Sequence, residues 1–101
     1  MPDVAQLPLR ALVESNRAEI KRVVANHRGR AVALFGSVAR AEETAESDID
    51  LLVDFEPGSS LFDLVRLADH LRSVLGRRVD VVSLGGLLPR DRGIRNDAIW
   101  L

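Results

Sequence analysis

Apolar positions along the chain follow two different spacings, and each spacing predicts a different kind of element. Between Leu9 and Arg28 they recur at helical spacing, with charged residues on the other faces, which predicts an amphipathic helix. A second stripe of this kind predicts a helix from Ser60 to Leu75, with Ser60 as its N-cap and Asp63 three residues on. Because each helix has one apolar stripe, we expect both to pack on the same face of a sheet.

Short apolar runs predict the strands of that sheet. The first is Arg30–Phe35, the second opens at Asp48 and ends at Phe55, and the third is Arg77–Ser83. The apolar tail, residues 98–101, supplies either a short fourth strand or a seal over the core. The expected fold is therefore α/β (α+β), with a small mixed sheet of three to four strands and helices packed on one face. Further expectations are short helices at Ser37–Ala41 and Arg90–Asp97 and a frayed lead-in at residues 1–8.

Length and charge narrow the class of protein. The 101 residues have room for a single domain, and no apolar run approaches the roughly 18 residues of a membrane span. The net charge of −1 lacks the basic excess of a general nucleic-acid binder, although six arginines lie between Arg72 and Arg95. There is no cysteine, which excludes disulfides and thiolate metal sites. We expect a soluble, cytoplasmic protein.

Asp48 and Asp50 carry the strongest chemical signal. Alternate residues of a strand share a face, so both carboxylates should point the same way, with Cα atoms roughly 6 to 7 Å apart. No lysine or arginine lies between Ala41 and Val65 to neutralise them locally. Mg²⁺ binds such carboxylates together with substrate phosphates. Ten residues separate this pair from Gly36-Ser37, where glycine would let the backbone approach a phosphate and serine adds a hydroxyl.

Gly36-Ser37, ten intervening residues and Asp48-x-Asp50 resemble the signature of the DNA polymerase β-like nucleotidyltransferase superfamily. The chain's size and flanking pattern are similar to its minimal nucleotidyltransferase (MNT) branch, the antitoxin partners of HEPN-domain toxins. Ala41 stands where that family commonly has glycine, and Thr44-Ala45 where Arg-Pro is common, which leaves the loop's conformation open. The alternative is an acidic turn without function.

The resemblance implies a set of site residues. A third carboxylate would come from the third strand, where Asp80 is the only acidic residue on offer. The catalytic residues would be Asp48, Asp50 and Asp80. These carboxylates would bind two magnesium ions, and manganese could replace magnesium. Gly36, Ser37, Arg40 and Ser47 would bind the nucleoside triphosphate, ATP. Arg40 has a structural alternative, which is an ion pair with the acidic loop of Glu42, Glu43 and Glu46. Ser47 also has a structural alternative, which is a hydrogen bond within the turn.

The resemblance also implies a partner and a reaction. The chain would transfer AMP from ATP to a hydroxyl, a tyrosine, of a HEPN-type toxin and so neutralise it within a hetero-oligomer. The alternatives are a nucleotidyltransferase for a small molecule or RNA, and an antitoxin that acts by binding alone. Expected partner contacts are Arg90, Arg92, Arg95 and Trp100, although Trp100 has the alternative of sealing the core. His27 is expected at a helix end, and His70 is expected on the surface rather than at a metal.

Overall fold

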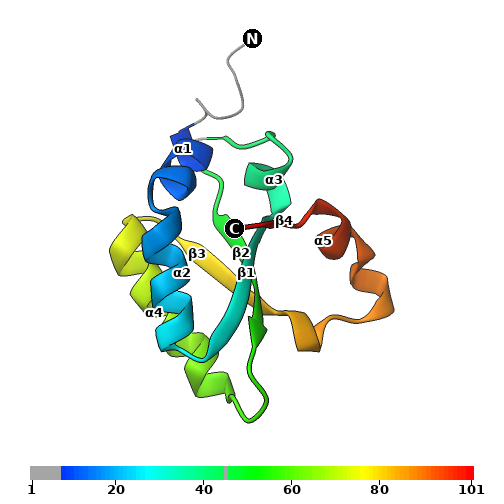
Figure 1. The fold of residues 1–101 in the computed structure, drawn as a ribbon. Helices are drawn as coiled ribbons and strands as arrows, with labels where there is room; N and C mark the ends of the chain where they lie inside the picture. Colours follow the sequence, from blue (N-terminus) through cyan, green and yellow to red (C-terminus); the bar gives the residue numbers. More distant parts are fainter. Residues whose placement is uncertain (1–7, 45) are drawn as a thin grey trace.

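The computed structural model describes residues 8–44 and 46–101, and its elements follow the predicted order (Figure 1). The helices are α1 (Pro8–Ser15), α2 (Arg17–Asn26), α3 (Gly36–Ala39), α4 (Leu61–Leu75) and α5 (Arg92–Asp97). The strands are β1 (Gly29–Phe35), β2 (Ile49–Phe55), β3 (Val79–Ser83) and β4 (Ile99–Trp100). Most of the expected lead-in lies outside the described residues. Pro8 itself begins α1. This position suits proline, because the N–H group that proline lacks would have no partner within the helix there.

The four strands form one mixed sheet in the order β3-β2-β1-β4. β1 runs antiparallel to both β2 and β4, whereas β2 and β3 are parallel and are joined by α4. The two-residue tail strand pairs Ile99 with Leu34 and Trp100 with Ala33. The predicted α/β fold is therefore confirmed, and the fourth strand is present.

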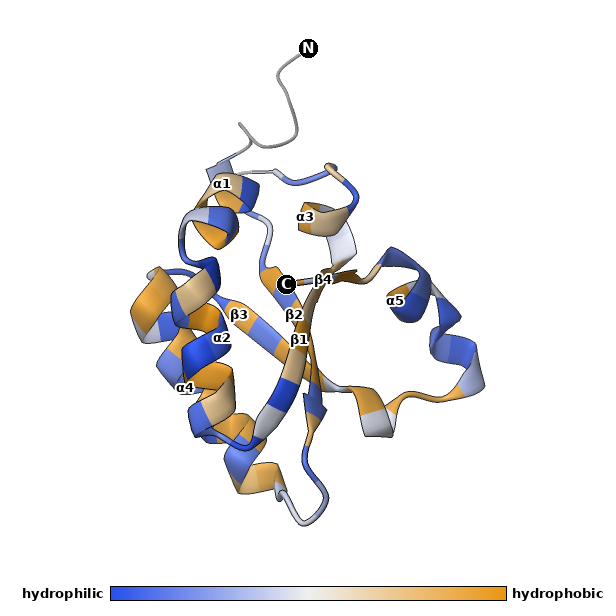
Figure 2. Cartoon of the chain, in the orientation of Figure 1, coloured by the Kyte–Doolittle hydropathy of each residue, from blue (hydrophilic) through white to orange (hydrophobic). Residues whose placement is uncertain are grey.

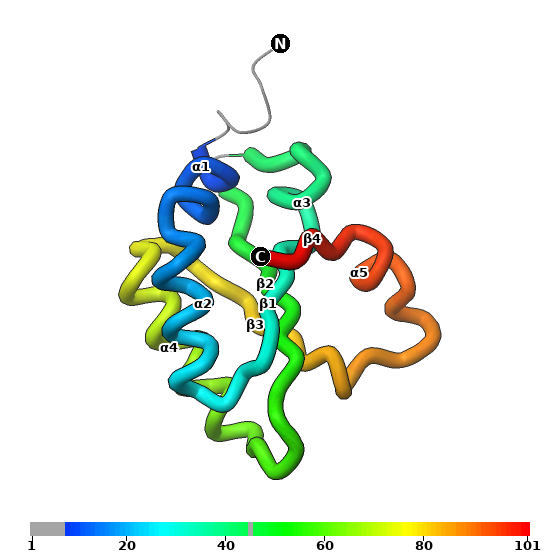
Figure 3. Tube along the Cα trace, in the orientation of Figure 1, coloured from blue at the N-terminus to red at the C-terminus, as the bar shows by residue number. Residues whose placement is uncertain are grey.

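Helices α2 and α4 pack side by side on one face of the sheet (Figures 1 and 3). Hydrophobic and hydrophilic residues alternate along both helices, as their amphipathic patterns predicted (Figure 2). The core between these helices and the sheet consists of fully buried aliphatic side chains: Ile20, Val23, Val24, Val32, Leu34, Ile49, Leu51, Val53, Leu67, Leu71 and Val79. Burial of this apolar area stabilises the fold and confirms that the long helices share one face.

The other face of the sheet is also partly covered, although the predicted fold has helices on one face alone. Phe35, Ala33 and Leu52 form a second, smaller core there, and partly buried side chains from the segment after β3, including Leu87 and Ile94, pack on it. This segment continues β3 through 3₁₀ turns at residues 84–86 and 89–91 into α5. The part of the face at the start of β2 and β3 carries Asp50 and Asp80 instead.

The predicted helix from Leu9 to Arg28 is wrong in one respect, because it consists of two helices that meet at Asn16. The Asn16 side-chain amide donates a 2.8 Å hydrogen bond to the carbonyl of Leu12, so it satisfies a backbone group at the end of α1. Asparagine competes in this way with the helical hydrogen-bond pattern.

Other elements differ from expectation at their ends. β1 begins at Gly29 and β2 at Ile49, each one residue from the predicted start, and α2 ends at Asn26. The third strand begins at Val79 because Arg77 and Arg78 belong to the turn after α4, whose last residue is followed by left-handed Gly76 at φ 63°. The short helix after β1 is Gly36–Ala39, and the last helix begins at Arg92. The start of α4 agrees with the prediction, since the Asp63 carboxylate accepts a 2.8 Å hydrogen bond from the Ser60 N–H.

The loop between α3 and β2 is tied to the first helix. Glu43 accepts hydrogen bonds from the backbone N–H groups of Leu9, at 2.9 Å, and of Arg10, at 3.1 Å. A carboxylate at this position satisfies amides that have no partner within the helix and complements the helix dipole. No helix in the described part of the chain is long and apolar enough to cross a membrane.

Candidate active site

The residues singled out in the sequence meet where β1 ends and where β2 and β3 begin. Asp50 on β2 is paired in register with Phe35 of β1 on one side and with Asp80 of β3 on the other. Paired residues on neighbouring strands lie about 5 Å apart, well within the span of a metal site. Asp50 and Asp80 alternate with Ile49 and Val79, which are fully buried under the helices. Both carboxylates therefore lie on the opposite face of the sheet.

Gly36 packs directly against the carboxylate of Asp50. Its φ of +74° lies in the left-handed region, and a Cβ atom at this position would collide with Oδ2 of Asp50. The sequence suggested glycine here for close approach to a phosphate. The structure adds a second reason, because a larger residue would displace the carboxylate.

Negative charge accumulates at this end of the sheet. The pKa of Asp50 is raised from its ordinary 3.8 to about 6, chiefly by burial and further by the charges of Asp80 and Asp48, while the charge of Arg40 lowers it. Like charges and desolvation both disfavour the ionised carboxylate. The described residues leave this charge incompletely compensated, which is the environment that a divalent cation relieves.

Asp48 is held by a residue that sequence reasoning missed. Arg78, in the turn before β3, places its Nε 3.1 Å from Asp48 Oδ1. Oδ1 is buried, yet it has no partner with hydrogen-bond geometry. The sequence indicated only that no basic residue lies near Asp48 along the chain. The turn after α4 supplies one from thirty positions away.

Arg40 makes one contact of its structural alternative, the ion pair with Glu42, and its charge also acts on Asp50. It lies in the turn after α3 and forms ion pairs with Glu42, at 3.0 Å, and with Asp97 at the end of α5, at 2.8 Å. Two carboxylate partners raise the pKa of this guanidinium above its ordinary value. Arg40 therefore links the short helix α3 to the C-terminal helix, and its side chain is 44% exposed.

The remaining loop positions are placed as follows. Ser37 is half-buried in the first turn of α3, beside Gly36. Ser47 accepts a 2.8 Å hydrogen bond from the N–H of Thr44, the turn contact that was its structural alternative. Ala41 has a φ of +60°, so the loop keeps the left-handed conformation that glycine adopts easily, although the residue is alanine.

The donor set has the chemistry of a site for a hard divalent ion. Among residues 8–44 and 46–101, no three carboxylate or histidine side chains converge closely enough to hold one metal ion together as they stand. Asp50 and Asp80 face each other across neighbouring strands, whereas Asp48 is engaged by Arg78. Carboxylate oxygens are the ligands that Mg²⁺ and Mn²⁺ prefer, and the buried Oδ1 of Asp48 still lacks a hydrogen bond.

The two histidines lie together, outside this group. His27 follows the last residue of α2, as predicted, and its Nε2 is 3.1 Å from Nδ1 of His70 on α4. Their rings meet edge to face. The histidine pair lies at the start of β1, whereas Gly36 and the site carboxylates lie at the opposite end of that strand. Neither histidine is therefore part of the carboxylate site. Trp100 is 46% exposed on β4, so it seals the core only in part.

Comparison with known proteins identifies the family. Residues 18–90 match the family model described as polymerase beta, nucleotidyltransferase. A candidate protein adenylyltransferase of Methanocaldococcus jannaschii is 44% identical over 90 residues, which cover 83% of this chain and 96% of that protein. A solved candidate minimal nucleotidyltransferase has 46% identity and a TM-score of 0.75, over 88% of this chain and 95% of the other.

A more distant solved structure, a mutant of the MntA–HpeT toxin–antitoxin complex, has 25% identity and a TM-score of 0.71, over 85% of this chain and 71% of the other. The fold, the matched range and these relatives agree. The chain belongs to the polymerase β nucleotidyltransferase family, and it is an enzyme of that class.

Proposed function

We propose that this nucleotidyltransferase is a protein adenylyltransferase that acts as an antitoxin. In this proposal it transfers AMP from ATP to a tyrosine hydroxyl of a HEPN-type toxin. The observation that carries the proposal is the in-register pairing of Asp50 with Asp80, with Asp48 two residues before Asp50 and Gly36 against its carboxylate. Two similarities support the choice of substrate: a relative named for protein adenylylation and a structural neighbour from a toxin–antitoxin complex.

The chemistry assigned to the chain's own residues is phosphoryl transfer. Asp48, Asp50 and Asp80 would hold magnesium, which supplies charge stabilisation for an in-line displacement at the α-phosphorus. Asp80 would accept the proton of the attacking hydroxyl as the new oxygen–phosphorus bond forms. The bond from the α-phosphorus to the bridging oxygen breaks, and that oxygen leaves with pyrophosphate. The backbone N–H groups at Gly36 and Ser37 and the guanidinium of Arg40 would bind the phosphates.

Asp80 is suited to the acceptor side because of its position in the sheet. It lies on β3, which is an edge strand, and its side chain is exposed. Asp50 lies on the next strand inward and is partly buried. An acceptor on another protein can therefore approach Asp80 without entering the fold.

Two other functions compete with this one. A nucleotidyltransferase for a small molecule or for RNA would use the same carboxylates on a different acceptor. An antitoxin that acts by binding alone would not need them. The three neighbouring carboxylates favour an enzyme, because like charges held together destabilise a protein that gains no ligand from them.

Labelled nucleotides distinguish these functions. The full chain is incubated with Mg²⁺, a HEPN-type toxin and each labelled nucleoside triphosphate in turn, and mass spectrometry locates added mass. We expect AMP on a toxin tyrosine with the wild type and none with the Asp48→Asn, Asp50→Asn double variant. The matched control is Asp54→Asn, a neutralised carboxylate on the same strand, which should keep transfer.

Co-expression with the toxin provides the second readout. If the double variant protects cells as well as the wild type, and the toxin carries no nucleotide, neutralisation is by binding and the enzymatic proposal fails. Label on RNA or on a small molecule, with none on protein, would favour the other enzyme class.

A further inference from the structure

Arg78 contacts the one carboxylate of the site that lies outside the paired strands, that of Asp48, which directly precedes β2. Its Nε lies 3.1 Å from Oδ1 of Asp48, whereas Asp50 and Asp80 are paired across the sheet. We infer that Arg78 is a resident counter-ion: it takes the place of a divalent cation at Asp48 in the metal-free protein and has to withdraw before Asp48 can join Asp50 and Asp80 around a metal. The inference rests on the metal site of the proposed function and adds a residue that competes for it.

The backbone of Arg78 is fixed beside the site. Its carbonyl accepts a 3.0 Å hydrogen bond from the N–H of Ile49, the residue between Asp48 and Asp50. The turn that carries it begins at Gly76, whose N–H donates a 2.8 Å hydrogen bond to the carbonyl of Arg72. These backbone hydrogen bonds hold the Cα atom of Arg78 next to the start of β2, so its side chain extends from a position close to Asp48.

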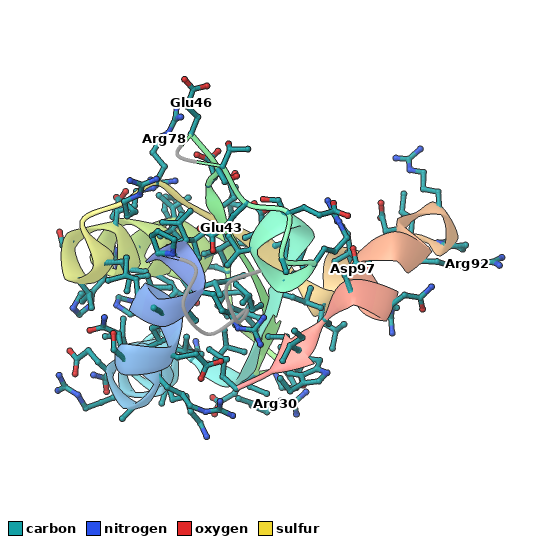
Figure 4. All side chains as sticks on the ribbon, turned by 90° about the horizontal axis from the view of Figure 1, so that it is seen from above. Arg30, Glu43, Glu46, Arg78, Arg92 and Asp97 are labelled. Atoms are coloured by element: carbon teal, nitrogen blue, oxygen red, sulfur yellow. The ribbon has the colours of Figure 1, made fainter. Side chains whose placement is uncertain are left out.

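The side chain itself is free to withdraw. The Arg78 side chain is 79% exposed, so little packing holds it in place. A cavity of about 510 Å³ lies beside it, lined by Glu46, Ser47, Asp48, Gly76, Arg77 and Arg78. Figure 4 shows Arg78 and Glu46 projecting from the same edge of the molecule, so an alternative carboxylate is at hand when Asp48 is taken by a metal.

The size of the effect follows from this exposure. Ion pairs between exposed groups favour the paired state by a factor of about two to five. A ligand that binds the unpaired state has its apparent affinity reduced by about the same factor. Arg78 should therefore lower the affinity for a divalent ion by about two- to fivefold without blocking the site.

The test is Mn²⁺ binding to the full chain in the absence of nucleotide, followed by electron paramagnetic resonance of the free ion. Arg78→Gln should bind Mn²⁺ about two- to fivefold more tightly than the wild type, and Arg78→Lys should return towards the wild-type affinity. The matched control is Arg77→Gln, which removes the same charge from the neighbouring position. The Arg77 guanidinium has its contact with the backbone carbonyl of Ser47, so it should show the smaller, general effect of a lost charge.

Each outcome decides the inference. Equal Mn²⁺ affinities for Arg78→Gln and Arg77→Gln, or weaker binding by Arg78→Gln, would overturn the role of Arg78 while the proposed enzyme stands. Mn²⁺ binding that the Asp48→Asn, Asp50→Asn double variant does not reduce would overturn the metal site and the inference together. Circular dichroism of each variant, unchanged from the wild type, excludes unfolding as the cause.

Discussion

Replacing Asp50 by asparagine should stabilise the metal-free protein at neutral pH and leave its stability unchanged in acid. The folded-state pKa of about 6 lies above the ordinary value of 3.8. The folded protein therefore binds a proton that the unfolded chain has lost, and stability falls as pH rises between these two values. Above the folded pKa the charged carboxylate imposes its full cost. Below pH 3.8 the unfolded chain is also mostly protonated, and the cost disappears.

The magnitude follows from the shift. A displacement of about two pKa units corresponds to about 3 kcal/mol for a group shielded from solvent. Asp50 is only partly buried, so solvent screening reduces the expected gain for Asp50→Asn to about 1 to 2 kcal/mol. In a chain of this length that gain raises the melting temperature by roughly 5 to 10 °C.

Urea denaturation in EDTA, at pH 8 and at pH 4, measures this difference. Asp54→Asn is the matched control, because Asp54 lies on the same strand and has a cationic partner, Arg30, at 3.2 Å. The control should lose up to about 1 kcal/mol, the opposite sign. A gain for Asp50→Asn that is as large at pH 4 as at pH 8, or a loss at pH 8, would refute the account of crowded negative charge.

Four further substitutions, one of them a control, test the site and the loop that leads to it, with unfolding free energies or Mn²⁺ binding as the measurement. Glu43→Ala should lower the free energy of unfolding by about 1 kcal/mol, because it leaves the first amides of α1 without a partner. Its control, Glu42→Ala, should change the free energy of unfolding by less than half of that. Ala41→Gly should stabilise the loop by up to about 1 kcal/mol, since alanine is strained at this positive φ; a loss would contradict that strain. Gly36→Ala should weaken Mn²⁺ binding by displacing the Asp50 carboxylate, and unchanged binding would show that the carboxylate adapts.

The sequence was most informative where local patterns decide the structure. Strand alternation predicted that Asp50 points away from the core, opposite to Ile49, and the family resemblance added Asp80 from the third strand. The structure pairs Asp50 with Asp80 in register. Helical stripes predicted α4 and the face that it covers. These patterns repeat within a few residues, so the chain itself carries the information.

Contacts between distant turns could not be predicted in this way. Arg78 meets Asp48, and Glu43 meets the start of α1, because the folded chain brings separate loops to one place. Neither pair has a characteristic spacing along the sequence. The division at Asn16 was missed for a different reason, since an asparagine side chain can either face solvent or bind a carbonyl without changing the apolar stripe.

The contact between Glu43 and α1 has a practical consequence for work with this protein. The loop that leads into Asp48 is anchored at one end to the first turn of the first helix. A fusion partner or affinity tag placed directly before Pro8 would disturb the first turn of α1. Through the hydrogen bonds to Glu43, it would also disturb the segment that positions Asp48. Attachment at a distance from α1, through a flexible spacer, would leave that segment undisturbed.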